Sequence, residues 1–235
     1  MRRLGLLGGM SWESSVVYER LINERVREHL GGVTSADLLI RSFNFADIEK
    51  LQAAGKWDEA GEVLAHAAAD LERAGAEAIV LCTNTMHQVA GAITKATSIP
   101  LLHIVQATGR AITQAGVKKV LLLGTKYTME QPFYKDALAD TFALDVITPD
   151  DDGRAVVHDI IYNELVQGII REESRATVKG VIDKAVANDG VHGVIAGCTE
   201  IELLIQANHV GVAYFPTTTI HAHYAADWAL GGEEE

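Results

Sequence analysis

The chain has 235 residues, 48% of them hydrophobic and 22% charged, so it is long and apolar enough to fold around one large core or two smaller ones. Its formal net charge of −12 argues against a nucleic-acid-binding protein, which requires a basic surface. No apolar run reaches the roughly 20 residues that a membrane-spanning helix needs. The start Met1-Arg2-Arg3 has no cleavable signal pattern, and we therefore expect a cytoplasmic protein that binds neither membranes nor nucleic acids.

The two cysteines, Cys82 and Cys198, are far apart in the sequence. In a reducing compartment they do not indicate a disulfide framework, and neither has partners at the spacing of a metal site. The glycines Gly5, Gly8 and Gly9 lack the G-x-G-x-x-G spacing of dinucleotide-binding turns. The sequence therefore favours neither a metal nor a dinucleotide cofactor.

Short apolar runs alternate with amphipathic stretches along the first half of the chain. Ser11 is a candidate N-cap for the first helix, and Gly31 and Gly32 are its stop signals. The predicted elements are strands at residues 4–9, 36–43, 77–82 and 100–104, and helices at residues 12–30, 47–54, 57–73 and from 84 or 85 to 97.

The same pattern then begins again. Thr128 is a candidate cap for a helix that reaches residue 140, and Thr199 is a candidate capping hydroxyl with Glu200 and Glu202 in the first turn of the next helix. The predicted elements are strands at residues 118–125, 144–147, 191–195 and 214–216, and helices at residues 128–140, 154–166, 173–187, from 199 onward and 217–230, before a frayed tail at residues 231–235.

Alternating strands and helices of these lengths are typical of parallel sheets covered by helices on both faces. We therefore predict an α/β fold of two pseudo-symmetric, doubly wound domains with a cleft between them. An offset of 116 residues between the halves matches Cys82 with Cys198. An offset of 115 instead matches Thr83 with Cys198 and keeps the preceding strands in register. A slip of one residue reverses the face of every side chain, and the sequence leaves both offsets open.

Ligands of doubly wound sheets bind at the carboxyl ends of the strands. A catalytic group on each side of a small molecule suits inversion of a stereocentre, because one group removes a proton and the other returns one to the opposite face. A thiol is suitable because its pKa of about 8.5 lies near working pH. Cys198 precedes a predicted helix, whose N-terminus favours the thiolate. A free cysteine is also commonly a small buried hydrophobe, so both interpretations stay open.

Four motifs carry a resemblance that spans essentially the whole chain: Gly8-Gly-Met-Ser11, Cys82-Thr-Asn-Thr85, Gly124-Thr-Lys-Tyr-Thr128 and Gly197-Cys-Thr-Glu200. Together they resemble the aspartate/glutamate racemase superfamily, and most of all its bacterial aspartate and amino-acid racemases. The resemblance implies a racemase that interconverts L- and D-aspartate or glutamate without pyridoxal phosphate or another cofactor. It also implies a homodimer, with residues 1–98 and 211–235 in the first domain and residues 99–210 in the second.

The family's usual first motif is Cys-Asn-Thr, but here Thr83 stands directly before Asn84 and Cys82 lies one residue earlier. The resemblance therefore implies Thr83 and Cys198 as the catalytic pair, with Cys198 acting on the L enantiomer. Because adjacent strand residues point to opposite faces, we expect Cys82 to pack under the sheet. A curved strand end would still let it reach the site.

The resemblance also implies which residues hold the substrate. Four polar residues match family positions that bind the amino and carboxylate groups, although helix capping is the ordinary role of such residues; they are Asn84, Thr85, Thr125 and Thr199. Glu200 would tune Cys198 or complement the helix dipole, and Met10 and Gln52 would line the distal part of the pocket. His87 is expected to be a satisfied core or surface histidine, with a place near the site as the alternative.

Three alternatives stay open. Maleate isomerases, arylmalonate decarboxylases and hydantoin racemases share the scaffold and use the two thiol positions differently. A binding protein that has lost catalysis with its first thiol would be stabilised by aspartate without exchanging its α-proton. A redox pair would require the sulfurs of Cys82 and Cys198 to reach disulfide distance.

Overall fold

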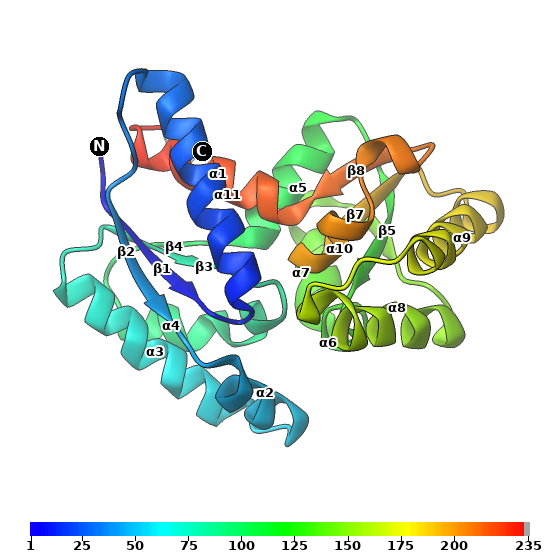
Figure 1. Ribbon diagram of the computed structural model, residues 1–235, viewed down its shortest axis with the longest axis horizontal. Helices are drawn as coiled ribbons and strands as arrows, with labels where there is room; N and C mark the ends of the chain where they lie inside the picture. Colours follow the sequence, from blue (N-terminus) through cyan, green and yellow to red (C-terminus); the bar gives the residue numbers. More distant parts are fainter. Residues whose placement is uncertain (233–235) are drawn as a thin grey trace. The chain divides into compact units, whose positions relative to one another are not determined.

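The computed structural model describes residues 1–232, and the chain divides into two compact units (Figure 1). The first unit consists of Met1–Ile104 and the chain from His221 onward, and the second unit is Val105–Ile220. Each contains a four-stranded parallel sheet. This arrangement confirms the predicted α/β class and its two matching halves.

The first sheet has the strand order β2-β1-β3-β4. Its strands are β1 (Leu4–Gly8), β2 (Leu38–Ser42), β3 (Ala78–Leu81) and β4 (Leu101–Leu102). The helices of this unit are α1 (Trp12–Leu30), α2 (Phe45–Ala53), α3 (Trp57–Arg73), the 3-10 helix η1 (Thr85–Val89), α4 (Ala90–Ala96) and most of α11 (Thr217–Ala229). As predicted, α1 begins after Ser11, whose side chain accepts a hydrogen bond from the Ser14 N–H, and ends at Gly31.

Helices cover both faces of the first sheet (Figure 1). On one face Leu4, Leu6 and Val80 pack with residues of α1 and α11. On the other, Leu7 and Ile79 pack with residues of α2, α3 and α4. Because strand side chains alternate between faces, Ala78 and Val80 of β3 belong to the first of these cores, and Ile79 and Leu81 belong to the second.

The second sheet repeats the topology with the order β6-β5-β7-β8. Its strands are β5 (Lys119–Gly124), β6 (Asp145–Ile147), β7 (Gly193–Gly197) and β8 (Ala213–Pro216). Its helices are α5 (Ile104–Gln114), α6 (Lys126–Glu130), α7 (Pro132–Phe142), α8 (Asp151–Asn163), η2 (Leu165–Gln167), α9 (Glu172–Asp189), α10 (Thr199–Leu204) and η3 (Ala207–His209). None of the helices in residues 1–232 is both long enough and apolar enough to span a bilayer.

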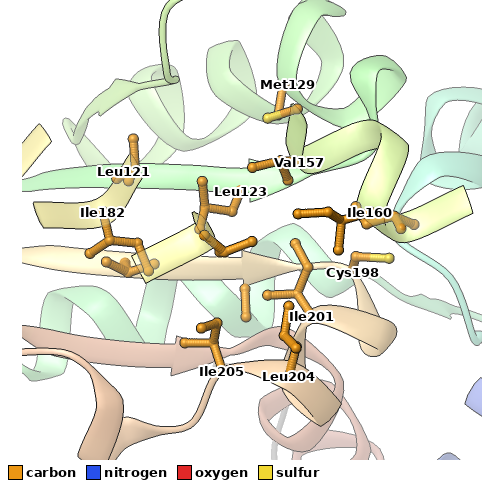
Figure 2. Packing of buried hydrophobic residues seen from close by; sticks show 14 of the residues in the cluster. Leu121, Leu123, Met129, Val157, Ile160, Ile182, Cys198, Ile201, Leu204 and Ile205 are labelled. Atoms are coloured by element: carbon orange, nitrogen blue, oxygen red, sulfur yellow. The ribbon is translucent and has the colours of Figure 1, made fainter. Parts of the chain in front are cut away.

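One face of the second sheet packs against α8, α9 and α10 (Figure 2). Leu121 and Leu123 of β5 contribute to this core with Val157 of α8 and Ile182 of α9, and Cys198 belongs to the same cluster. In chain order, α8 and α9 join β6 to β7 as α2 and α3 join β2 to β3. The two helix pairs are therefore equivalent.

Local predictions in the second unit need correction. Thr125 rather than Thr128 is the N-cap after β5, because its side chain accepts from the Thr128 N–H. The predicted helix is two helices, and Pro132 begins the second, a position where proline is favoured because it needs no N–H donor there. Asp150 caps α8 and starts it earlier than expected. Helix α5 was not predicted from the sequence.

The unit boundaries also differ from the predicted ones. β4 pairs with β3, and β8 pairs with β7. Residues 101–102 therefore complete the first sheet and residues 213–216 the second, whereas the prediction placed each in the other domain. The reason is physical: an edge strand satisfies its backbone groups only in the sheet to which it pairs. Most of the predicted tail, residues 233–235, lies outside the described residues.

A buried hydrogen bond joins α1 to α11, since the Tyr18 hydroxyl lies 2.8 Å from His221 Nδ1 and both side chains are fully buried. We expect Tyr18→Phe to lower the free energy of unfolding by roughly 1–3 kcal/mol, because it leaves a buried ring nitrogen unsatisfied. Urea denaturation measures this. Val33→Ala, at a fully exposed position, serves as the control and should change stability by less than about 0.5 kcal/mol. Equal stability of Tyr18→Phe and the wild type would contradict the assignment.

Candidate active site

The sheet registers decide between the two offsets that the sequence left open. Leu7 of β1 pairs with Leu81 of β3, and Leu123 of β5 pairs with Ala196 of β7. When β1 and β5 are matched at their terminal glycines, residue 7 corresponds to residue 123, an offset of 116 (123 − 7). Their pairing partners then correspond at an offset of 115 (196 − 81). Two residues beyond these partners, Thr83 corresponds to Cys198.

The core contacts give the same answer independently. Cys198 belongs with Val194 and Ala196 to the cluster that packs against α8 and α9. Cys82 belongs with Val80 to the cluster on the α1 side of the first sheet, which is the opposite side from the equivalent helices α2 and α3. Thr83 is the next residue, so continued alternation would place it on the side that Cys198 occupies in its own unit.

Cys82 packs under the sheet, as predicted. It is fully buried, and its thiol lies 3.7 Å from the Val80 carbonyl oxygen as a weak donor. Burial raises the pKa of this thiol, so it stays protonated and unreactive in the folded protein.

Cys198 is the N-cap residue of α10 and is 8% exposed. Its thiol donates a hydrogen bond to Glu200 Oε2 at 2.9 Å. Burial raises the pKa of the Cys198 thiol well above its ordinary value, the Glu200 carboxylate raises it further, and hydrogen bonds from the N–H groups of Glu200 and Ile201 oppose this. Burial and the acidic neighbour therefore outweigh the helix N-terminus, which alone would favour the thiolate.

Thr199 does not cap α10 as predicted; it is the first helical residue, and its hydroxyl accepts from the Thr218 hydroxyl at 3.0 Å. Two further hydrogen bonds join the first turn of α11 to α10. Glu202 accepts one from the Thr218 N–H at 2.7 Å and the other from the Thr219 hydroxyl at 3.1 Å. These partners were not predicted from the sequence, although three consecutive threonines, Thr217, Thr218 and Thr219, begin the helix. Together these contacts fix the short helix that follows Cys198.

The close approach of β5 and β7 also shapes this strand end. A Cβ atom at Gly197 would lie 2.7 Å from the Leu123 carbonyl oxygen, so only glycine fits directly before Cys198. Thr125 and Thr128, after β5, are buried with their hydroxyls 3.3 Å apart. Thr125, Thr199, Cys198 and Glu200 are thus gathered at the carboxyl ends of two neighbouring strands.

In the first unit Thr83 lies two residues after the end of β3, before η1. Its side chain is half-buried, whereas the neighbouring Asn84 and Thr85 are buried. The Thr83 N–H donates to the Leu81 carbonyl, and the Thr83 carbonyl lies 2.7 Å from His87 Nδ1. Within residues 1–232 the structure gives the Thr83 hydroxyl no basic hydrogen-bond partner, so it is a weak base and a better proton donor.

Gln52 is brought next to Met86 on the α2 side of the first sheet, and Met10 belongs to the same core cluster. The Gln52 amide nitrogen donates to the Met86 sulfur at 3.0 Å. The amide oxygen is buried and has no hydrogen-bond partner in the described part of the chain. An unsatisfied buried oxygen costs about 1–3 kcal/mol, so a donor supplied by a ligand would be stabilised there.

A groove of about 670 Å³ lies apart from these residues, between the end of β6, α8 and α9. Its lysine and arginine, Lys184 and Arg154, are paired with Asp150 and Glu130. It includes none of the predicted site residues, and we do not assign chemistry to it.

The carboxylate of Glu200 should slow alkylation of the Cys198 thiol. Glu200→Gln removes the carboxylate that raises the pKa of Cys198, so the thiolate fraction at a given pH should rise about tenfold for each pKa unit that is lost. The rate of iodoacetamide alkylation at Cys198, followed by peptide mass spectrometry from pH 7 to 10, measures this. Glu202→Gln is the matched control, because Glu202 lies on the same short helix and contacts the threonines of α11 instead. An unchanged or slower rate in Glu200→Gln would contradict the assigned cause.

Burial raises the pKa of Glu202 from 4.5 to about 7, so the free energy of unfolding should depend on pH. Between these values the folded protein binds a proton more tightly than the unfolded chain, so this contribution to stability falls as pH rises. Glu202→Gln keeps an oxygen acceptor for the Thr218 N–H and does not ionise. We expect it to gain roughly 1–3 kcal/mol over the wild type between pH 5 and pH 8, measured by urea denaturation. Glu173→Gln, at an exposed position, should show no such pH-dependent gain, and a pH-independent difference for Glu202→Gln would contradict the raised pKa.

The sequence and fold are similar to those of known proteins. In solved structures, the chain is similar to a candidate Asp/Glu racemase from Yersinia pestis, with 53% identity, a TM-score of 0.92 and coverage of 98% of this chain and 100% of that one. It is similar to an aspartate racemase homologue from Pyrococcus horikoshii, with 34% identity, a TM-score of 0.86 and coverage of 98% and 100%.

A curated relative, a broad specificity amino-acid racemase of Bacillus subtilis, is 27% identical over 151 residues. That alignment covers 63% of this chain and 63% of the relative, so it does not reach over the relative's whole length. The family model described as Asp/Glu/Hydantoin racemase matches residues 7–225, which include both strand ends. The chain therefore belongs to the Asp/Glu/hydantoin racemase family.

Proposed function

We propose that the protein interconverts the L and D enantiomers of aspartate or glutamate, without pyridoxal phosphate, by proton removal and return at the α-carbon. Cys198 acts on the L enantiomer and Thr83 serves the opposite face. The observation that carries the proposal is the register, which gives Thr83 and Cys198 equivalent places after the third strand of each sheet. Two equivalent groups suit a reaction whose two directions differ only in the face attacked.

The proton on Cys198 must leave before the sulfur can act as a base. Glu200 accepts the thiol hydrogen bond and is the group to which this proton passes when substrate binds. The thiolate then takes the α-proton of the L-amino acid and becomes a thiol, leaving a carbanion. The Thr83 hydroxyl gives a proton to the other face and regains one from water. The hydroxide that this leaves takes the proton from Glu200, so every group returns to its starting protonation state.

The carbanion must be stabilised by groups that bind the substrate's α-carboxylate. Thr85 and Thr199 are buried hydroxyls close in sequence to the two catalytic positions. Thr125 is a buried hydroxyl after the neighbouring strand β5, and Asn84 adds an amide. Hydrogen bonds from such groups strengthen as negative charge develops on the carboxylate. We assign the amino and α-carboxylate groups of the substrate to these four residues.

The distal end of the substrate is assigned to Gln52, with Met10 beside it. The Gln52 amide is neutral and its oxygen unsatisfied, and an amide offers both donors and an acceptor. This observation favours a second candidate, an amino-acid racemase of wider specificity, because the unsatisfied amide oxygen accepts a hydrogen bond from an uncharged polar side chain, whereas a carboxylate has no hydrogen to donate to it. The Bacillus subtilis relative is described as a racemase of that kind.

The test is incubation in D₂O with L-aspartate or L-glutamate, with ¹H NMR following loss of the α-proton and chiral chromatography following the D enantiomer. We expect wild-type protein to exchange the α-proton of the L-amino acid faster than it inverts the substrate, because sulfur is the better base. Cys198→Ala should lose both processes by at least about a thousandfold. Thr83→Val should keep exchange and lose inversion.

Cys82→Ala is the matched control, because Cys82 is buried in the core and should affect only stability. Exchange and inversion rates within about threefold of the wild type are expected for it. Loss of both rates in folded Cys82→Ala would show that Cys82, not Thr83, carries the reaction. No exchange from any amino acid by the wild type would reject the racemase proposal.

A further inference from the structure

We propose that His87 is a positioning residue that fixes the Thr83 backbone, and with it the direction of the Thr83 hydroxyl. This inference rests on the proposed function, because it assigns His87 to the proton transfer at Thr83. His87 itself is 3% exposed and belongs to η1, four residues after Thr83. Its role is to orient the turn rather than to touch the substrate.

The hydrogen bonds of His87 define its tautomer. The Ile104 N–H donates to His87 Nε2 at 3.2 Å, and because a backbone N–H only donates, Nε2 must carry a lone pair. The hydrogen of the neutral ring is therefore on Nδ1, which lies 2.7 Å from the Thr83 carbonyl oxygen and donates to it. One ring thus links the turn after β3 to the backbone at the start of α5.

Neighbouring groups hold this ring in its neutral form. Burial lowers the pKa of His87 well below its ordinary value, and the adjacent His103 and His221 lower it further. The ring of His103 lies 4.5 Å from that of His87, and the ring of His221 lies 5.8 Å away. A proton on Nε2 would face the Ile104 N–H, so the charged form would lose this bond.

Hydrogen bonds of His221 hold the backbone on the other side of His103. His221 Nε2 lies 2.7 Å from the Leu102 carbonyl oxygen, and His221 Nδ1 lies 2.8 Å from the Tyr18 hydroxyl. Residues 102 and 104 are therefore both held by ring nitrogens, on either side of His103. Both ring nitrogens of His87 and of His221 have protein partners, which leaves neither ring a nitrogen for a metal ion. Across residues 1–232, no group of three or more His, Cys, Asp or Glu side chains is arranged to hold one.

Loss of the His87–Thr83 hydrogen bond should affect proton transfer at only one face of the substrate, the face that Thr83 serves. Thr83 has no side-chain hydrogen bond of its own to fix its rotamer within the described residues, so its orientation depends on the backbone that His87 holds. A misplacement of about 1 Å at a reacting group can cost a hundredfold in rate. Cys198 is held by other contacts, in the second unit, so loss of the His87 bond should leave L-side proton removal intact.

Two substitutions separate the two bonds of His87. In His87→Asn the amide nitrogen takes the place of Nδ1 and keeps a donor for the Thr83 carbonyl, whereas the acceptor for the Ile104 N–H is lost. In His87→Gln the amide oxygen reaches the place of Nε2 and keeps that acceptor, whereas the donor to Thr83 is lost. Each variant leaves one buried backbone group unsatisfied, so their stabilities should be similar. Thermal unfolding checks that both are folded.

The readout is the ratio of α-proton exchange to inversion for L-aspartate in D₂O, with L-glutamate as the second substrate. We expect this ratio to rise at least tenfold in His87→Gln, because inversion falls while exchange stays within about twofold of the wild type. In His87→Asn the ratio should stay within about threefold of the wild-type value. A purely structural role would lower exchange and inversion together and leave the ratio unchanged in both variants.

An unchanged ratio in His87→Gln, or a tenfold rise in His87→Asn, would overturn the positioning role even if only one of the two variants folds. Failure of the positioning role can be distinguished from failure of the proposed function. If the proposed function fails, the wild-type protein itself exchanges no α-proton.

Discussion

The parallel register of β3 against β1, and of β7 against β5, is the constraint on which the rest of the structure depends. Side chains alternate between the faces of a strand, so one residue of register decides which group lies toward α8 and α9 in the second unit and toward the equivalent α2 and α3 in the first. In the second unit that group is Cys198. In the first unit the equivalent residue is Thr83. Cys82, one residue earlier, lies in the core beneath α1 and α11. The position of a cysteine along the chain is therefore a poor guide to its role.

The two equivalent strand ends differ in chemistry. Cys198 is a buried thiol against the carboxylate of Glu200, so it has a defined partner for its proton. Thr83 is a hydroxyl whose orientation comes from its backbone, which His87 ties to Ile104. In the proposed reaction the first arrangement suits a base that must lose a proton before it acts, and the second suits a donor. The symmetry of the fold and the asymmetry of its side chains together explain why exchange and inversion are expected at different rates.

Most of the fold could be predicted from the sequence because hydrophobic periodicity and caps agree along much of the chain. Helices α1 and α3 begin and end at the predicted residues, and Cys82 is buried as alternation requires. Helix α5 was missed, and the cap after β5 was placed on Thr128 instead of Thr125. The raised pKa of Cys198 could not be predicted either, because it depends on burial and on where the Glu200 carboxylate points. Long-range partners such as Thr218 for Thr199 and Ile104 for His87 follow only from the folded chain.

The most direct test of the account is a crystal structure of the protein with L-aspartate or L-glutamate bound. The account predicts that the Cys198 sulfur lies on the side of the α-carbon that carries the proton of the L enantiomer, and that the Thr83 hydroxyl lies on the opposite face. It also predicts that the Cys82 sulfur stays in the core, out of contact with the ligand. A ligand whose α-carbon contacts Cys82, or one that binds away from either strand end, would contradict it.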